Sequence, residues 1–170
     1  KEPDQEYIVQ TIVGQKDIAK MVDGNGTEAT TKLPTGIAFA PDGSLWFTDR
    51  GHNYIRRISP DFLVTSLLNV AIDGKSAIWQ GGFDSRGNYY FVDKAKGLLR
   101  KVEANTMTLS TVASGLKSPM NVIFDDDDNM YVSARYNKAI YKFTPAGVKT
   151  TFATLAASPN YIVFDKNKNM

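Results

Sequence analysis

Short apolar stretches separated by polar turns recur along the chain with a period of about 40 residues. Each unit starts with a short apolar or glycine stretch that ends in Phe, followed by a polar turn and a second apolar stretch. The four aligned turns read FAPDGSL from Phe39, FDSRGNY from Phe83, FDDDDNM from Phe124 and FDKNKNM from Phe164. Gly or Asn follows four or five positions after each Phe, as Gly43, Gly87, Asn129 and Asn169. Because these residues tolerate the positive φ of tight hairpins, the pattern predicts strand, hairpin, strand.

Two further strands complete each unit. The third strand alternates apolar and charged residues, as in YIRRI at 54–58 and LLRKV at 98–102, which indicates a strand with one face outward. Four short antiparallel strands per repeat are typical of a β-propeller blade, so the predicted fold class is all-β. The expected whole blades cover residues 34–70, 77–114 and 118–154. The remaining segments are expected to be single strands of two more blades, at 7–13 and 160–164, and a linker at 1–6.

The stretch LPTGIAFAPDGSLWFTDRGHNYIRRI at 33–58 resembles an NHL repeat. It has the Pro-x-Gly-Ile-Ala-Phe lead, an Asp-Gly turn, an Asp at the end of the second strand, and then Asn and Ile-Arg-Arg-Ile. The segment 7–14 is similar to the last strand of a preceding NHL blade, and the resemblance extends over residues 7–170. It weakens in the third repeat, where Ala134 replaces the strand-end acid. Streptogramin-lyase and gluconolactonase-like propellers are looser resemblances.

The resemblance has consequences for the architecture and the location. An NHL propeller with six blades needs roughly 250 residues at this period, so three whole blades form a partial ring. The ring would be completed either by further blades of the same chain or by a second copy. The resemblance also implies a bacterial secreted or surface protein, located in the periplasm, outside the cell or at the cell surface.

Composition changes this picture little. The 170 residues are 42% hydrophobic and 22% charged, an ordinary globular mixture. The absence of cysteine excludes disulfides, Cys-ligated metals and thiol catalysis. No run of about 18 apolar residues is present to span a membrane. The net charge of +2 argues for no polyanionic partner by itself, so such an argument must come from local clustering of charge.

Local clustering is found in the loops that join second to third strands. These loops share one face of a propeller with the connections between blades, and such faces commonly bind ligands. Each blade contributes Arg or Lys there, which suits phosphate, sulfate or carboxylate groups, although ordinary solvated loop charges are the alternative. The candidate ligand-binding residues are Arg50, His52, Asn53, Arg56, Lys94, Arg100, Arg135 and Asn137.

Candidates for catalysis and metal binding are few. His52 is the only histidine and lies beside Asp49, so it is a candidate general base. Asp49 and Asp93 end two second strands and are candidate ligands for a divalent cation such as Ca²⁺. The alternative is that each caps a loop by accepting backbone N–H bonds. The acidic run 125–128 matches a calcium loop in composition only and is expected to be a solvated turn.

Two tryptophans complete the set of candidates. Trp46 is expected to pack between blades, and Trp79, near the start of a blade, to approach the central axis or stack on a sugar. The function predicted first is a binding module for an anionic glycan or a protein partner. The alternatives are a metal-dependent lyase, lactonase or other hydrolase in the propeller channel, and RNA binding by the basic face. Whether the protein is an enzyme stays open at this point, and nucleic acid ranks last because few aromatic residues accompany the basic loops.

Overall fold

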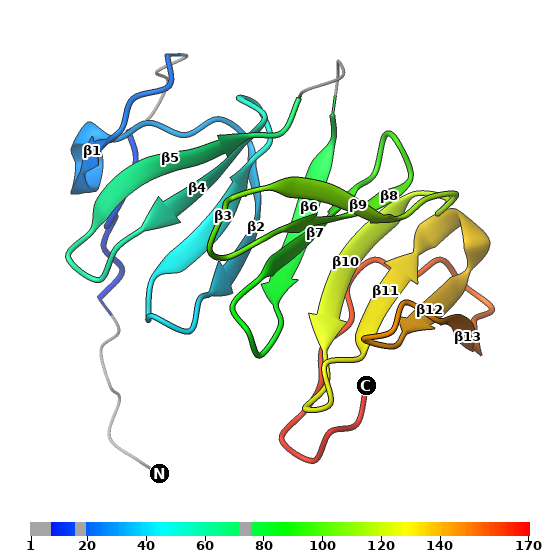
Figure 1. The fold of residues 1–170 in the computed structure, drawn as a ribbon. Helices are drawn as coiled ribbons and strands as arrows, with labels where there is room; N and C mark the ends of the chain where they lie inside the picture. Colours follow the sequence, from blue (N-terminus) through cyan, green and yellow to red (C-terminus); the bar gives the residue numbers. More distant parts are fainter. Residues whose placement is uncertain (1–7, 16–19, 72–75) are drawn as a thin grey trace, which may run out of the picture.

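The computed structural model describes residues 8–15, 20–71 and 76–170 and confirms the all-β prediction. Within these ranges it contains three antiparallel sheets and two short 3₁₀ helices. The sheets stand side by side as three successive blades, which is the arrangement of a partial β-propeller (Figure 1). The linker expected at 1–6, and Tyr7 of the expected first strand, lie outside the described residues.

Each blade is a meander of four strands. Blade 1 comprises β2 (Pro34–Phe39), β3 (Leu45–Asp49), β4 (Tyr54–Ile58) and β5 (Leu63–Asn69). Blade 2 comprises β6 (Ile78–Phe83), β7 (Tyr89–Asp93), β8 (Leu98–Val102) and β9 (Leu109–Ala113). Blade 3 comprises β10 (Pro119–Phe124), β11 (Met130–Ala134), β12 (Ala139–Phe143) and β13 (Lys149–Thr154), with the 3₁₀ helix η2 (Arg135–Asn137) between β11 and β12. A short strand, β1 (Gly24–Asn25), pairs with the outer edge of β5 and leads into the 3₁₀ helix η1 (Gly26–Glu28).

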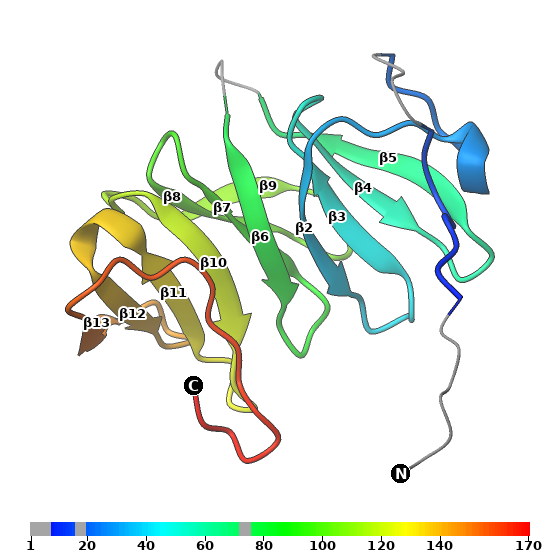
Figure 2. The same ribbon diagram turned by 180° about the vertical axis from the view of Figure 1, so that it is seen from behind.

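The first strands of the three blades, β2, β6 and β10, lie next to one another (Figure 2). The Thr35 hydroxyl donates a hydrogen bond to the Ile78 carbonyl at 2.9 Å, and the Gln80 amide donates to the Ile37 carbonyl at 2.8 Å. Glycine is required at position 36, because a Cβ there would lie 2.6 Å from the Cα of Gln80. This close approach of two backbones sets blade 1 against blade 2.

The polar turns follow the sequence pattern in the first two repeats and differ from it in the third and fourth. Gly43 and Gly87 adopt the positive φ that was expected of them. In the third repeat the left-handed residue is Asp128, with φ 58°, and in the fourth it is Lys168, with φ 64°, so neither Asn129 nor Asn169 is left-handed. The Asn129 side chain instead donates hydrogen bonds to Asp125, while the Asp128 carboxylate accepts two from Ser85 of the neighbouring hairpin. The acidic run is therefore a turn, as expected, and the structure adds that Asp125 caps it.

The core consists of layers between the blades. Strand β7 is buried along its whole length, so its alternate side chains pack into two different layers. Tyr89 and Phe91 join the layer against blade 1, and Tyr90 and Val92 join the layer against blade 3. Trp46 packs in the first of these layers, as predicted, with its ring centroid 5.2 Å from that of Phe83.

Two segments that form no strand contact the outer faces of blades 1 and 3. Residues 8–13 and 160–164, where single strands were expected, have no ladder partner within the described ranges. Val13 nevertheless packs on the outer face of blade 1, and Ile162 is buried against blade 3, where its N–H donates to the Asn121 side chain at 3.1 Å. In the described part of the chain no helix has the length and apolarity to cross a membrane.

Candidate functional site

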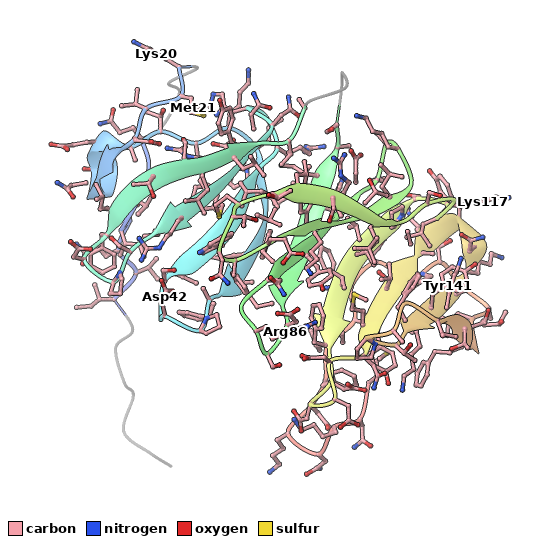
Figure 3. The ribbon with its side chains drawn as sticks, in the orientation of Figure 1. Lys20, Met21, Asp42, Arg86, Lys117 and Tyr141 are labelled. Atoms are coloured by element: carbon pink, nitrogen blue, oxygen red, sulfur yellow. The ribbon has the colours of Figure 1, made fainter. Side chains whose placement is uncertain are left out.

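The basic loops gather at one end of the three sheets. The loop face is defined here by residues 50–53, 94–97, 114–118 and 135–138, which join second to third strands or connect blade 2 to blade 3. The first hairpins of each blade lie at the opposite end, where Figure 3 labels Asp42 and Arg86, away from Lys117 on the loop face. The antiparallel meander thus separates the basic loops from the acidic hairpin of residues 125–128.

A groove of about 580 Å³ lies on the loop face and receives residues from all three blades. A site of this volume is in the range that holds small ligands. The described lining residues include no Asp or Glu. Its basic and aromatic lining residues are Arg50, Trp79, Lys94, Lys96, Lys117 and Tyr136.

Trp79 brings two of these cations together. The guanidinium carbon of Arg50, from blade 1, lies 5.5 Å from the centre of the indole ring. The ammonium nitrogen of Lys94, from blade 2, lies 4.8 Å from the same ring. A ring face attracts cations through its quadrupole, which offsets part of the repulsion between them. Trp79 therefore holds two positive groups of different blades beside one groove.

The side chain of Asp93 fixes the backbone conformation of the loop that contains Lys94. One carboxylate oxygen, Oδ1, accepts hydrogen bonds from the backbone N–H groups of Ala77, Ala95 and Lys96 at 3.1–3.2 Å. This is the capping role that was set against metal binding in the sequence. The other oxygen, Oδ2, is buried and has no hydrogen-bond partner.

The opposite wall is built from the connection between blades 2 and 3 and from η2. The backbone N–H of Tyr136 donates to the Lys117 carbonyl at 3.0 Å, and the Lys117 N–H donates to the Asn137 side chain at 2.9 Å. Gly97 closes the groove at the base, because a Cβ there would lie 2.4 Å from the Leu116 carbonyl oxygen. These contacts fix the backbone of Tyr136 at the rim, where the side chain is 69% exposed.

Four of the predicted ligand-binding residues lie at or beside this groove. Arg50 and Lys94 line it. Arg135 stacks on Tyr136, with the guanidinium carbon 5.9 Å from the ring centre. Asn137 supports the wall through Lys117.

His52 and Asn53 belong to the turn after β3. The His52 Nδ1 atom lies 3.0 Å from Asp49 Oδ2, and the histidine side chain is 12% exposed. Asn53 adopts a left-handed conformation with φ 61°, and its carbonyl accepts a hydrogen bond from the Val70 N–H at 2.9 Å. Asn53 thus shapes the turn through its backbone.

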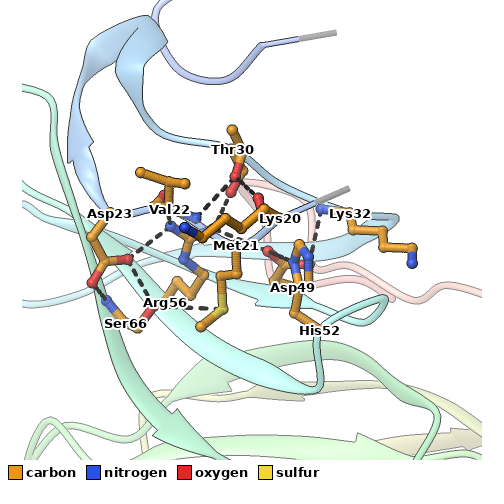
Figure 4. Close-up of polar contacts among 10 residues, drawn as sticks. All are labelled: Lys20, Met21, Val22, Asp23, Thr30, Lys32, Asp49, His52, Arg56 and Ser66. Atoms are coloured by element: carbon orange, nitrogen blue, oxygen red, sulfur yellow. Dashed lines mark hydrogen bonds and ion pairs between the residues drawn. The ribbon is translucent and has the colours of Figure 1, made fainter. Parts of the chain in front are cut away.

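Arg56 is not on the loop surface, which corrects the sequence-based expectation. Its side chain is fully buried, and Nη1 donates to Asp49 Oδ2 at 3.0 Å and to the Thr30 carbonyl (Figure 4). Nη2 donates to Asp23 Oδ1 at 2.9 Å and to the Val22 carbonyl at 2.8 Å. An arginine with four acceptors has little capacity left for a ligand, so Arg56 is a structural residue.

Asp23 is the outer member of this network. Partial burial raises the pKa of its carboxyl group, but hydrogen bonds from Ser66 and Arg56 outweigh that effect. The pKa of Asp23 is therefore below its ordinary value, and the carboxylate stays ionised beside Arg56 at neutral pH.

Arg100 is also buried, at 7% exposure, although it was predicted as a rim residue. The register places it in blade 2 where Arg56 stands in blade 1, opposite Phe91 as Arg56 is opposite Phe47. Its Nε atom has no hydrogen-bond partner, and Arg100 forms no ion pair with any described residue. It is removed from the candidate surface.

The predicted metal ligands are engaged in other contacts. Asp49 accepts hydrogen bonds from the Lys32 N–H at 3.0 Å and from Arg56, and Asp93 caps its loop. Among the described residues no group of three or more His, Asp or Glu is arranged to hold a metal ion.

Sequence reasoning missed Lys117 as a groove residue, although a signal was present. Lys117-Ser118-Pro119 precedes the first strand of blade 3 as Lys32-Leu33-Pro34 precedes that of blade 1. The middle residue is left-handed in both, with φ 56° at Ser118 and 52° at Leu33. The repeated Lys-x-Pro could have indicated a basic residue at each entry to a blade.

The fold and its loop face define a propeller of the NHL class. The sequence profile described as the teneurin NHL domain matches residues 6–108, more than half of the chain. The protein therefore belongs to the teneurin NHL domain family. No curated protein matches the chain in sequence.

Solved structures with low sequence identity share the fold. Streptogramin B lyase superposes with a TM-score of 0.70 at 15% identity, over 81% of this chain and 47% of the lyase chain. A chain of the nidogen–laminin complex gives 0.71 at 20% identity, over 81% and 54%. A gluconolactonase from Xanthomonas campestris gives 0.62 at 14% identity, over 74% and 48%. The chain thus spans about half the length of these structures.

Proposed function

We propose that this propeller segment is a binding module whose loop face takes an anionic glycan. The observation that carries the proposal is the groove in which Arg50 and Lys94 both lie against the ring of Trp79. The described lining residues of this groove include no acid. Hydrogen bonds from charged donors to carboxylate or sulfate are about twice as strong as neutral ones. The hairpin turns that hold the acidic run lie at the other end of the sheets, so they do not oppose a negative ligand here.

Binding to charged and neutral polysaccharides tests the proposal. We expect dextran sulfate and polygalacturonate to bind, unsubstituted dextran not to bind, and affinity to fall steeply with salt because surface charges are screened. Lys94→Glu should weaken binding by about tenfold or more, since it reverses one of two cations at the groove. Lys166→Glu is the matched control, because it makes the same charge change on an exposed residue of the C-terminal turn. Equal effects of the two variants would contradict a site in the groove.

A hydrolase or lyase is the second candidate, and one contact favours it. The Asp49–His52 pair, with 3.0 Å between Oδ2 and Nδ1, resembles a general base oriented by a carboxylate. Turnover of esters and lactones should then disappear in His52→Asn. Turnover that persists in this variant would rule out His52 as the base.

The partner and the location follow as proposals. A second, apolar groove of about 460 Å³ lies on blade 1 beside Ile37, which is 54% exposed. Exposed apolar surface of this kind normally contacts another element, and we infer a further blade as its partner. The blade would come from the same chain or from a second copy, which light scattering with intact mass measurement distinguishes. A secreted or cell-surface location suits the glycan ligand and is supported by the family resemblance.

A further inference from the structure

The loop-face groove has two chemically different walls. Arg50 and Lys94 form a cationic wall on Trp79, whereas Tyr136 forms an aromatic wall that is largely exposed. The two walls come from different blades, so a ligand between them contacts three blades at once. A ligand that uses both walls must carry a negative group at one side and an apolar surface at the other.

The indole ring of Trp79 is already engaged. Arg50 and Lys94 approach its ring at 5.5 and 4.8 Å, and its N–H is buried without a hydrogen-bond partner. Trp79 is therefore a positioning residue that orients two cations, and not the surface on which a sugar stacks. Two adjacent cations can share a single carboxylate or sulfate, which gives that group charge-assisted hydrogen bonds from both sides.

Tyr136 offers the more exposed aromatic surface, because a single cation, Arg135, approaches its ring and the side chain is still 69% exposed. Its backbone is fixed by the Lys117 carbonyl, and its ring is exposed beside Arg135. An aromatic ring with one polar end suits a ligand that is both apolar and hydrogen-bonding. The C–H face of a pyranose ring has this character. Ser118 adds a hydroxyl to the lining, whose contact in the protein is the weak acceptor sulfur of Met120 at 3.9 Å.

We infer that the groove recognises one acidic sugar residue, with its carboxylate or sulfate between Arg50 and Lys94 and its ring against Tyr136. This inference rests on the proposed function and makes it specific. A binding site for one acidic sugar differs from a diffuse basic surface, because affinity depends on a ring as well as on charge.

Small probes separate the ring from the charge. Isothermal titration of the whole chain would use methyl glucuronide, the neutral methyl glucoside and acetate. We expect methyl glucuronide to bind at least about tenfold more tightly than either of the others, because only it contacts both walls. Glucose 6-sulfate replaces the carboxylate by a sulfate and shows which acid the cations prefer.

Variants at Tyr136 and Trp79 assign the two walls. Tyr136→Ala should weaken methyl glucuronide by about tenfold and leave acetate unchanged, and Tyr136→Phe should restore the sugar affinity. Trp79→Leu should weaken both ligands, because the cations lose their common ring. Circular dichroism and the melting temperature establish that each variant is folded.

Two results would overturn the inference and point to different conclusions. If polysaccharides bind with steep salt dependence but methyl glucuronide binds no better than acetate, the single-sugar site is wrong and the anionic-glycan function stands. If neither polysaccharide nor methyl glucuronide binds, the proposed function fails as well. An RNA of equal charge that binds more tightly than every glycan would likewise exclude both.

Discussion

Blades 1 and 2 each contain an Asp and an Arg at equivalent positions of the register, but only the two residues of blade 1 form an ion pair. In blade 1, Asp49 and Arg56 are both fully buried and bond to each other at 3.0 Å. In blade 2, Asp93 Oδ2 is buried without a hydrogen-bond partner, and Arg100 forms no ion pair with a described residue; the Nε atom is unbonded in both arginines, so it does not distinguish the blades. In blade 3 the same positions hold Ala134 and Tyr141, so the blade fold itself does not need the pair.

The difference comes from a segment outside the blades. Residues 22–30 precede blade 1 and supply Arg56 with two carbonyls and with the Asp23 carboxylate. Asp23 is in turn anchored to β5 by the Ser66 N–H and hydroxyl at 2.8 and 2.7 Å. Residues 22–30, named here the closing segment, thus stabilise the buried ion pair of blade 1. The ion pair in turn attaches the closing segment to the propeller.

The largest expected effect on stability comes from breaking the Asp49–Arg56 ion pair of blade 1. Arg56→Met should lower the free energy of unfolding by about 3–5 kcal/mol, because it leaves the Asp49 carboxylate buried without its cation. Chemical denaturation of the whole chain measures this change. The double variant Asp49→Asn with Arg56→Met should recover part of the loss, since neither charge then remains unpaired. A loss below about 1 kcal/mol for Arg56→Met would show that the Asp49–Arg56 pair does not attach the closing segment to the propeller.

The fold was accessible from the sequence because its signal is repeated and local. Apolar stretches and turns recur at fixed offsets, and each four-stranded blade of the structure lies within one repeat. The left-handed position of the third hairpin was missed, since Asp128 stands where the first two repeats have glycine. The pairs Asp49/Arg56 and Asp93/Arg100 look equivalent in sequence. The structure shows that the distant segment 22–30 supplies further acceptors to Arg56, which forms an ion pair with Asp49.

The groove was partly predictable for the same reason. Arg50 and Lys94 were found because they follow the strand-end Asp in two repeats. The placement of both on Trp79 depends on how blade 1 packs against blade 2, which no local pattern specifies. Arg56 and Arg100 were misplaced because alternation along a strand indicates which face a residue takes, but not whether another segment covers that face.

Replacing Arg100 should not lower the free energy of unfolding as replacing Arg56 does. Arg100→Met should leave the free energy of unfolding unchanged or raise it by about 1 kcal/mol, because a buried cation without an ion-pair partner among the described residues is replaced by an apolar side chain of similar length. The same denaturation measurement applies, with Arg56→Met as the direct comparison. A loss as large as that of Arg56→Met would mean that Arg100 is stabilised by interactions equivalent to those of Arg56.

The smallest expected effect concerns Asp23, and it depends on pH. The pKa of Asp23 is lowered in the folded protein, so its contribution to stability is full above the unfolded value near 3.8 and is lost as the pH falls through the lower folded pKa. Because the Asp23 side chain is 44% exposed, solvent screening limits that contribution to at most about 1 kcal/mol. Asp23→Asn should therefore be slightly less stable than the unmodified chain at pH 7, and the difference should vanish once the pH has fallen below the lowered pKa of Asp23. A difference that stays constant down to that pH would assign the effect of Asp23 to its hydrogen bonds with Ser66, and would show that the closing segment is attached to blade 1 by geometry more than by charge.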